Sequence, residues 1–376
     1  MNILIGADLV PTKSNINEFE SRKMNSLLGE DLKSLIVSSD YRIFNLEVPL
    51  TDKAYPIDKN GPYLISSSNS INGYIDMNTS LLTLANNHIL DQGEQGLEST
   101  CKVLEENGIP YVGVGQTPDE AAEPYIFECD GKKIGVYACA EHEFSIVSDK
   151  NAGANPFDPL ESPDHVARLK EQCDFVIVLY HGGKEHYRYP SPNLQKICRK
   201  LVEKGADLVV CQHSHCVGCE ERYLDGTIVY GQGNFLFDHS DSEFWQTSLL
   251  VSIGEDFNID YIPLIKYGSG VRLAEDDKAQ EILDDFRKRS EEIKQEGFVE
   301  TEYKKFADSY VDNYLFTFSG VRRSFAFRVI NKLSGYRYAK WCMRRKYKKH
   351  TLLAIRNFVE CEAHRELLLK GITDNG

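Results

Sequence analysis

Side chains that bind metals follow several short apolar runs along this sequence. They bring together carboxylate oxygens, an amide oxygen and imidazole nitrogens, a mixture of hard and borderline ligands that suits Mn, Fe or Zn better than a thiolate site would. The pattern therefore predicts a site for one or two divalent metal ions, built from distant segments of the chain. The residues are Asp8, Glu47, Asn87, His88, His181, His213 and His215.

Apolar runs that alternate with helical patterns would position these side chains. The spacing predicts helices over 96–107 and 192–204, each closed by a glycine, Gly108 and Gly205. This alternation is typical of an α/β domain, in which the carboxyl ends of the strands share one edge of the sheet. We therefore expect the candidate ligands to meet at that edge. The expected strands cover 3–7, 42–46, 81–85, 174–180 and 206–211.

Two segments predict hairpins rather than parallel strands, so we expect mixed sheets. One joins 125–128 to 133–139 around Asp130-Gly131, and the other joins 247–253 to 259–265. After Gly268-Ser269-Gly270 the composition changes to a charged helical pattern and then to an aromatic, basic one. This change predicts a domain over 1–270 followed by a helical region over 271–376.

Charge is distributed unevenly along the chain, whose net charge is −14. Residues 319–359 contain twelve Lys or Arg and no Asp or Glu, so the remainder has 31 basic against 57 acidic residues, a balance of −26. Two interpretations stay open: a solvated helical face that docks on the acidic body, or a surface for anionic lipid or a polyanionic partner. No recognised nucleic-acid-binding motif accompanies the charge, so we expect no nucleic-acid partner.

Composition places the chain among globular proteins, with 41% hydrophobic residues and no run of about 18 apolar residues. Met1 leads almost directly into a strand-like segment, and the ten cysteines are scattered. We expect a cytoplasmic protein with reduced thiols, peripheral to the inner face of the membrane if 319–359 binds lipid.

Two other kinds of site compete with the predicted metal centre. Cys211, Cys216 and Cys219 lie close in sequence to His213 and His215 and could form a structural zinc knuckle, although no second cysteine pair completes it. The chain has neither the Gly-x-Ser-x-Gly elbow of hydroxyl-nucleophile hydrolases nor a phosphate-binding loop. ATP-driven ligation would therefore need a partner protein.

The candidate residues lie in segments that resemble the CapA family of bacterial capsule and poly-γ-glutamate synthesis proteins, in that family's order, over roughly residues 1–265. That family is in turn similar to the calcineurin-like metallophosphoesterases. The resemblance implies a two-sheet αββα sandwich with metals at the strand ends, here followed by a C-terminal helical extension. The segments are Asn45-Leu46-Glu47-Val48-Pro49-Leu50-Thr51, Leu84-Ala85-Asn86-Asn87-His88 with Asp91, His181-Gly182-Gly183-Lys184-Glu185, His213-Ser214-His215, and Gly233-Asn234-Phe235 with Asp238.

The resemblance also implies a role for each residue. Asp8 and His215 would bind one metal, and Asn87, His181 and His213 the other, with Glu47 as the bridge. His88 would contact the substrate or protonate the leaving group. The residues expected to orient the ligands are Asp91, Glu185, Asn234 and Asp238.

This sequence departs from the phosphoesterase pattern at the first metal. Val10 stands where a histidine ligand is usual, so that site is one ligand short. Glu47 replaces the usual bridging aspartate, and Asn86 stands at a common glycine position, where asparagine tolerates a positive φ.

The resemblance implies a metal-dependent hydrolase that acts on a phosphoester or an anionic polymer precursor, working with a polymer synthase. Because Val10 leaves the first metal short of a ligand, a non-catalytic metal-binding accessory of polymer synthesis is the alternative.

Overall fold

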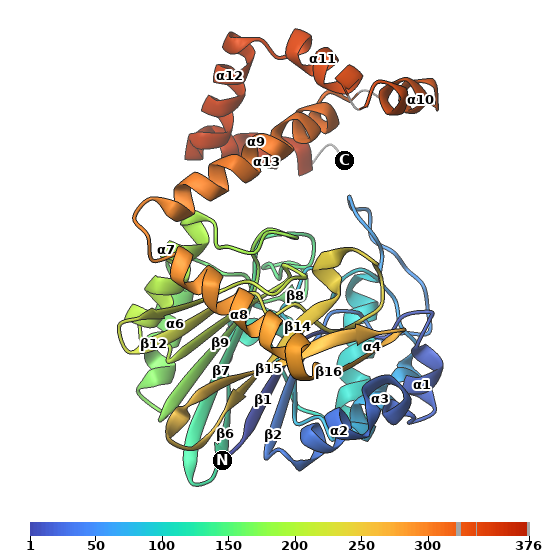
Figure 1. Ribbon diagram of the computed structural model, residues 1–376, viewed down its shortest axis with the longest axis vertical. Coiled ribbons are helices and arrows are strands. Elements are labelled where there is room, and N and C mark those ends of the chain that lie inside the picture. Colours follow the sequence, from blue (N-terminus) through green and yellow to red (C-terminus); the bar gives the residue numbers. More distant parts are fainter. Residues whose placement is uncertain (321–324, 336, 374–376) are drawn as a thin grey trace. The chain divides into compact units, whose positions relative to one another are not determined.

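The computed structural model describes residues 1–320, 325–335 and 337–373. It divides into two compact units, Met1–Glu300 and Thr301–Gly376, which Figure 1 shows in sequence colours. This division comes later in the chain than the boundary expected near residue 270. The reason is that α8, Asp276–Glu292, buries Ile282 and Phe286 in the core between the sheets of the first unit.

The first sheet has eight strands in the order β16-β15-β14-β1-β2-β3-β4, and β13 also pairs with β1. Strands β1 to β4 and β13 are parallel, whereas β14 to β16 form an antiparallel edge. The second predicted hairpin accounts for β14 and β15, and β16 extends it. The bounds are β1 Ile3–Val10, β2 Tyr41–Leu46, β3 Leu81–Thr83, β4 Tyr111–Val112, β13 Asn234–Phe237, β14 Thr247–Ile253, β15 Ile259–Tyr267 and β16 Gly270–Leu273.

The second sheet has six strands in the order β11-β12-β10-β9-β7-β6. The predicted hairpin of β6 and β7 is confirmed, and both of its turn residues have positive φ, 52° at Asp130 and 72° at Gly131. The bounds are β6 Tyr125–Cys129, β7 Lys132–Ala140, β9 Phe175–His181, β10 Leu208–Gln212, β11 Glu220–Tyr223 and β12 Gly226–Tyr230; a separate pair joins β5 Val114–Gly115 to β8 Gly153–Ala154.

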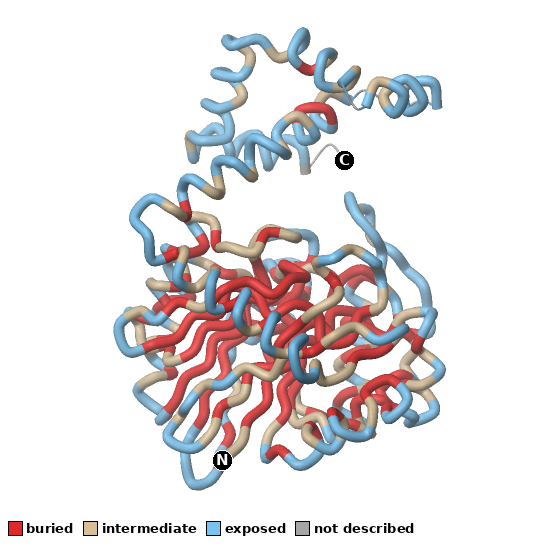
Figure 2. Tube along the Cα trace, viewed as in Figure 1, coloured by how far each residue is buried: buried red, intermediate tan, exposed pale blue. Residues whose placement is uncertain are grey.

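Alternating side chains of both sheets make a three-layered core. Ile3 and Ile5 of β1 share an apolar cluster between the sheets with Ile177 of β9, whereas Leu4 belongs to the cluster under the outer helices. The central strand β9 is buried along its whole length, as is usual for a parallel strand covered on both faces. Figure 2 colours buried residues red, and they are concentrated in the interior of the first unit. The predicted αββα sandwich is confirmed.

Helices cover both outer faces of the sandwich. The first sheet is covered by helices that share one apolar cluster, and the second by helices that share another. Helix α7 begins at Pro192, where the side chain of Ser191 accepts a hydrogen bond from the Leu194 N–H. The bounds are α1 Ile16–Glu20, α2 Met24–Ser38, α3 Ile71–Asp76, α4 Gly93–Glu106, α5 Pro118–Ala122, α6 Ser162–Lys170 and α7 Pro192–Glu203, with 3₁₀ turns η1 Ser68–Ser70, η2 Glu243–Trp245 and η3 Glu255–Phe257.

The second unit is helical, as the sequence predicts, and has a small core of Leu315, Phe316 and Met343. Within the described ranges, no helix combines the length and apolar character needed to span a bilayer. Residues 321–324 and 336 of the predicted basic segment lie outside the described residues. The helices are α9 Phe298–Phe318, whose first three residues belong to the first unit, α10 Phe325–Leu333, α11 Arg337–Lys346, α12 Lys349–Glu360 and α13 Glu362–Thr373.

Candidate metal centre

The predicted ligands meet at one edge of the sandwich, where parallel strands of both sheets end. Asp8 lies near the end of β1, Glu47 follows β2, and His181 is the last residue of β9. The turn after β10 supplies His213 and His215. Two groups of buried side chains result, Glu47 with His181 and His213, and Asp8 with Glu47 and His215; within each group the ligand atoms lie within 4.8 Å of one another.

Three side-chain atoms surround the Nε2 atom of His181. Asn87 Oδ1 lies 3.1 Å away, and Glu47 Oε1 and His213 Nδ1 each lie 3.2 Å away. One imidazole nitrogen carries at most one proton, so it cannot donate hydrogen bonds to three neighbouring atoms. Donor atoms that share a cation at about 2.0 to 2.2 Å lie roughly 3 to 3.5 Å from one another, which is the spacing observed.

Glu47 is the strongest structural sign of a cation. Its side chain is fully buried, and within the described part of the chain neither carboxylate oxygen accepts a hydrogen bond. Its Oε1 atom lies near His181 Nε2, which also contacts Asn87 and His213. A buried carboxylate with so few donors costs several kcal/mol unless a cation compensates it. The Glu47 carboxylate also belongs to both ligand groups, so these residues fit divalent metal binding.

The group around Asp8 is smaller. Asp8 Oδ2 lies 3.4 Å from His215 Nδ1, and Asp8 Oδ1 accepts a hydrogen bond of 2.8 Å from Asn45 Nδ2. Val10 is packed in the apolar cluster on the outer face of the first sheet and adds no donor atom. This group therefore has fewer protein ligands than the group around His181, in line with the sequence.

The turn that carries His213 and His215 has an uncommon backbone. Their φ angles are 81° and 52°, in the left-handed region that non-glycine residues rarely adopt. The backbone N–H of His213 donates to Asp8 Oδ2 at 3.4 Å, and the His215 ring lies 4.6 Å from the Trp245 ring. Such conformations cluster at functional sites, where surrounding contacts hold them in place.

The zinc-knuckle alternative is wrong for the part of the chain that the structure describes, because neither ligand group includes a cysteine. Cys211 and Cys219 instead lie in the apolar cluster outside the second sheet. Cys211 does so because β10 alternates its side chains between its two faces. All ten cysteines are free thiols, as expected.

His88 belongs to a buried polar cluster beside the ligands. Its Nδ1 atom lies 2.6 Å from Asp91 Oδ2, so Nδ1 carries the proton and donates to the carboxylate. Asp91 also accepts from the Leu64 N–H at 2.6 Å and forms an ion pair with Lys59. These contacts hold the imidazole ring in place through its Nδ1 atom, so its Nε2 atom can take part in proton transfer.

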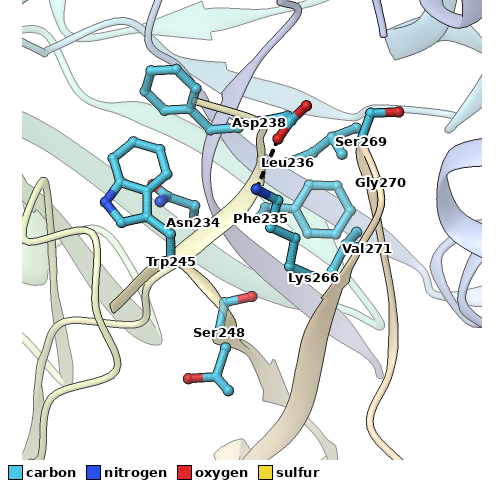
Figure 3. A pocket seen from close by; sticks show the side chains of 12 residues that line it. Asn234, Phe235, Leu236, Asp238, Trp245, Ser248, Lys266, Ser269, Gly270 and Val271 are labelled. Carbon is cyan, nitrogen blue, oxygen red and sulfur yellow. Dashed lines mark ion pairs between the residues drawn. The ribbon is translucent and has the colours of Figure 1, made fainter. Parts of the chain in front are cut away.

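Of the four residues expected to orient the ligands, Asp91 and Asn234 contact the predicted site residues, whereas Glu185 and Asp238 do not do so in the part of the chain that the structure describes. Asp91 contacts His88, and Asn234 Oδ1 lies 2.8 Å from His215 Nδ1. Within the described ranges, no hydrogen bond or ion pair joins Glu185 or Asp238 to a predicted ligand. Asp238 follows β13 and turns toward Lys266, 2.9 Å away, in the small pocket of Figure 3.

The structure adds three residues to which no role was assigned from the sequence. Asn45 donates to Asp8 and lies 3.2 Å from His181 Nδ1, and Glu143 accepts a 2.8 Å hydrogen bond from Asn87 Nδ2. Lys59 reaches Asp91 from the loop between β2 and α3. Only Asn45 had a sequence signal, because it stands two residues before Glu47 and strand alternation places both on one face.

Burial and charge decide where protons sit in this cluster. Burial alone would lower the pKa of His215, but its hydrogen bond to Asp8 and the charge of Glu47 raise that pKa to about 9. Burial likewise opposes protonation of His181, yet the charges of Glu47 and Asp8 raise its pKa. Burial, helped by the charges of His181 and His215, puts the pKa of His213 well below its ordinary value.

Metal binding should therefore strengthen as pH rises from 6 toward 9. A cation must displace the protons that His181 and His215 hold when no metal is present, and each displaced proton changes the affinity by roughly tenfold per pH unit. Isothermal titration with Mn²⁺ in buffers of different ionisation enthalpy would count the released protons. Equal affinity at pH 6 and pH 8 would contradict this expectation.

The structure thus combines a two-sheet sandwich with a cluster of carboxylate, amide and imidazole side chains at the strand ends. A family model described as "Bacterial capsule synthesis protein PGA_cap" matches residues 3–239, more than half of the chain. The protein belongs to this family.

Two relatives illustrate the family. The chain is 30% identical to "PGA biosynthesis protein CapA" of Bacillus subtilis (strain 168) over 54% of each protein. It is 26% identical to "Capsule biosynthesis protein CapA" of Bacillus anthracis over 60% of this chain and 57% of that protein. The chain thus spans little more than half the length of these relatives.

A similar solved structure is that of a putative 5′-nucleotidase from Staphylococcus aureus, with 14% identity and a TM-score of 0.42 over 76% of this chain and 58% of that one.

Proposed function

We propose that this protein is a metal-dependent hydrolase of the phosphoesterase type that acts in the synthesis of a bacterial surface polymer. The observation that carries the proposal is the convergence of Asn87, Glu47 and His213 on His181, next to the buried pair His88 and Asp91. A metal site alone could be structural, but a fixed imidazole beside it is an arrangement suited to proton transfer.

Asn87, His181 and His213 would hold one cation, Asp8 and His215 the other, and Glu47 would belong to both. Such cations would supply Lewis-acid polarisation and would lower the pKa of water toward neutrality. The mixed oxygen and nitrogen donors favour Mn, Fe or Zn.

The chain's own residues would control the proton that the leaving group needs. His88 would give the proton on its Nε2 atom to the departing oxygen, while Asp91 holds Nδ1–H in place. Lys59 offsets the charge of Asp91, so that the carboxylate orients the imidazole without being left as an uncompensated buried anion. Asn45 would keep Asp8 in position.

The substrate would be a phosphoester or an anionic precursor of the polymer. The names of the two relatives, which refer to PGA and to capsule biosynthesis, support a place in polymer synthesis. Because the protein sequence has no phosphate-binding loop for ATP, a partner synthase would carry out elongation of the polymer.

A second candidate is a non-catalytic accessory protein in which the metal stabilises the fold. Val10 favours it, because this buried valine leaves the Asp8 group with few protein ligands. Under this alternative the protein would bind metal, and loss of His88 would leave its biological output unchanged.

Metal analysis of the purified protein tests whether the site exists. We expect wild-type protein loaded with Mn, Fe or Zn to retain metal through gel filtration, and His213→Ala to lose most of it, because the substitution removes a buried ligand. His350→Ala, which changes an exposed histidine of the second unit, is the matched control and should retain wild-type content.

Hydrolysis by the loaded protein should then be measured on phosphoester, amide and glycan substrates. Turnover that requires metal supports the hydrolase. Full metal occupancy without turnover on any substrate would support the accessory role instead. Equal metal content in wild-type and His213→Ala protein would contradict the metal site itself.

A further inference from the structure

The second unit exposes far more apolar surface than its small core can explain. Among large hydrophobic side chains of the described residues, 16 are exposed in the second unit, and only 9 in the first unit, which is about four times as long. Soluble domains rarely leave contiguous apolar surface uncovered unless something binds there.

Helix α10 shows how this surface is arranged. Its inner face carries Phe327, which stacks on Phe316 with ring centroids 5.0 Å apart, and Asn331, whose Oδ1 accepts from the Ala339 N–H. Phe325, Val329 and Leu333 follow one another every four residues and therefore share a different face. They are 78%, 39% and 83% exposed.

Basic side chains border this apolar face. On a helical projection Arg328 and Lys332 flank it on the side opposite Ile330. Within the described part of 325–359, carboxylates pair only with Lys340 and Arg356, through Asp312 and Glu360. The basic side chains left without an acidic partner there are Arg328, Lys332, Arg337, Arg344, Arg345, Lys346, Lys348 and Lys349.

We propose that α10 and the basic residues of α11 and the turn after it bind the surface of an anionic lipid bilayer. Helix α10 is about 13 Å long and would lie in the interface, with Phe325, Val329 and Leu333 between the headgroups. Charge complementarity favours an anionic partner, because residues 319–359 have twelve cations and no carboxylate. The exposed apolar face of α10 selects a lipid bilayer over a purely polar polyanion. This inference concerns the second unit and does not depend on the proposed hydrolase function.

Vesicle flotation with the full-length protein tests the inference. We expect association with phosphatidylcholine vesicles that contain phosphatidylserine and none with pure phosphatidylcholine, and we expect high salt to release the protein. Arg344→Gln with Lys348→Gln should weaken association roughly 25-fold, since each basic residue near an anionic surface contributes about fivefold. Phe325→Ser with Leu333→Ser should weaken it at least tenfold, because the inserted apolar area is lost.

The control is Leu160→Ser with Leu224→Ser, two side chains of the first unit that are 78% and 70% exposed and should not affect association. Circular dichroism would verify that each variant keeps its helices. No association at low salt, or association that the α10 variant leaves unchanged, would overturn the inference. So would a dimer that Phe325→Ser with Leu333→Ser abolishes while vesicles stay unbound, because a second copy would then be the occupant.

Discussion

Replacing His88 with asparagine is expected to slow metal-dependent hydrolysis by about 10²- to 10⁴-fold, the usual contribution of a positioned general acid. Metal content should stay at the wild-type level, because none of the contacts that join the predicted ligands involves His88. The measurement pairs initial rates on an activated and an unactivated phosphoester with metal analysis of the same samples. The loss should be larger for the unactivated ester, whose leaving group needs the proton more.

Two controls make this result decisive. His350→Asn alters an exposed histidine of the second unit and should leave rates unchanged. The unfolding temperature of His88→Asn protein, measured with metal present, should stay close to wild type. Wild-type rates in a folded, metal-loaded His88→Asn protein would contradict the assigned role and favour the accessory alternative.

Replacing Glu47 with glutamine is expected to cost the largest share of metal affinity, at least 100-fold. Losing a residue that merely orients a ligand typically costs 10- to 100-fold, and Glu47 is the carboxylate common to both ligand groups. A cation at a hundredfold excess over its Kd stabilises the folded protein by about 2.7 kcal/mol. Added Mn²⁺ should therefore raise the Tm of wild-type protein by several degrees and that of Glu47→Gln hardly at all.

Glu128→Gln, an exposed glutamate on β6, is the matched control and should keep the full metal-induced increase in Tm. Differential scanning fluorimetry with and without metal measures all three proteins. The same increase in Glu47→Gln as in wild type would mean that the cation binds elsewhere, and the ligand assignment would then have to be abandoned. Loss of the increase in a Glu47→Gln protein that is otherwise folded would support the shared carboxylate.

Prediction from sequence worked best where a local pattern carried the information. The apolar run of β9 and the alternation of strands with helices are short-range features, and each predicted ligand stands within four residues of the end of a strand. Because parallel strands end at one shared edge, Asp8 lies near His215 although more than 200 residues separate them in sequence.

Prediction was less complete where a side chain's partner comes from a segment without regular structure. Lys59 lies in a polar loop with no periodicity, so nothing in the sequence indicated its ion pair with Asp91. Strand β16 was missed because Gly270 begins it: its Cα packs on the Leu27 backbone, where any Cβ would lie 2.1 Å from the carbonyl oxygen. Asp238 has a strand-end position but turns to Lys266.

The sequence by itself determined which chemical groups are available and that they stand at strand ends, because residue type and periodicity are local properties. Only the tertiary structure decided which of them meet. Three features depend on chain segments that packing of the sheets and loops brings together: the convergence of side chains on His181, the burial of the Glu47 carboxylate and the ion pair of Lys59 with Asp91. Burial also decides which histidines are protonated, because charges interact more strongly away from water. Glu47 and Asp8 therefore raise the pKa of both His181 and His215.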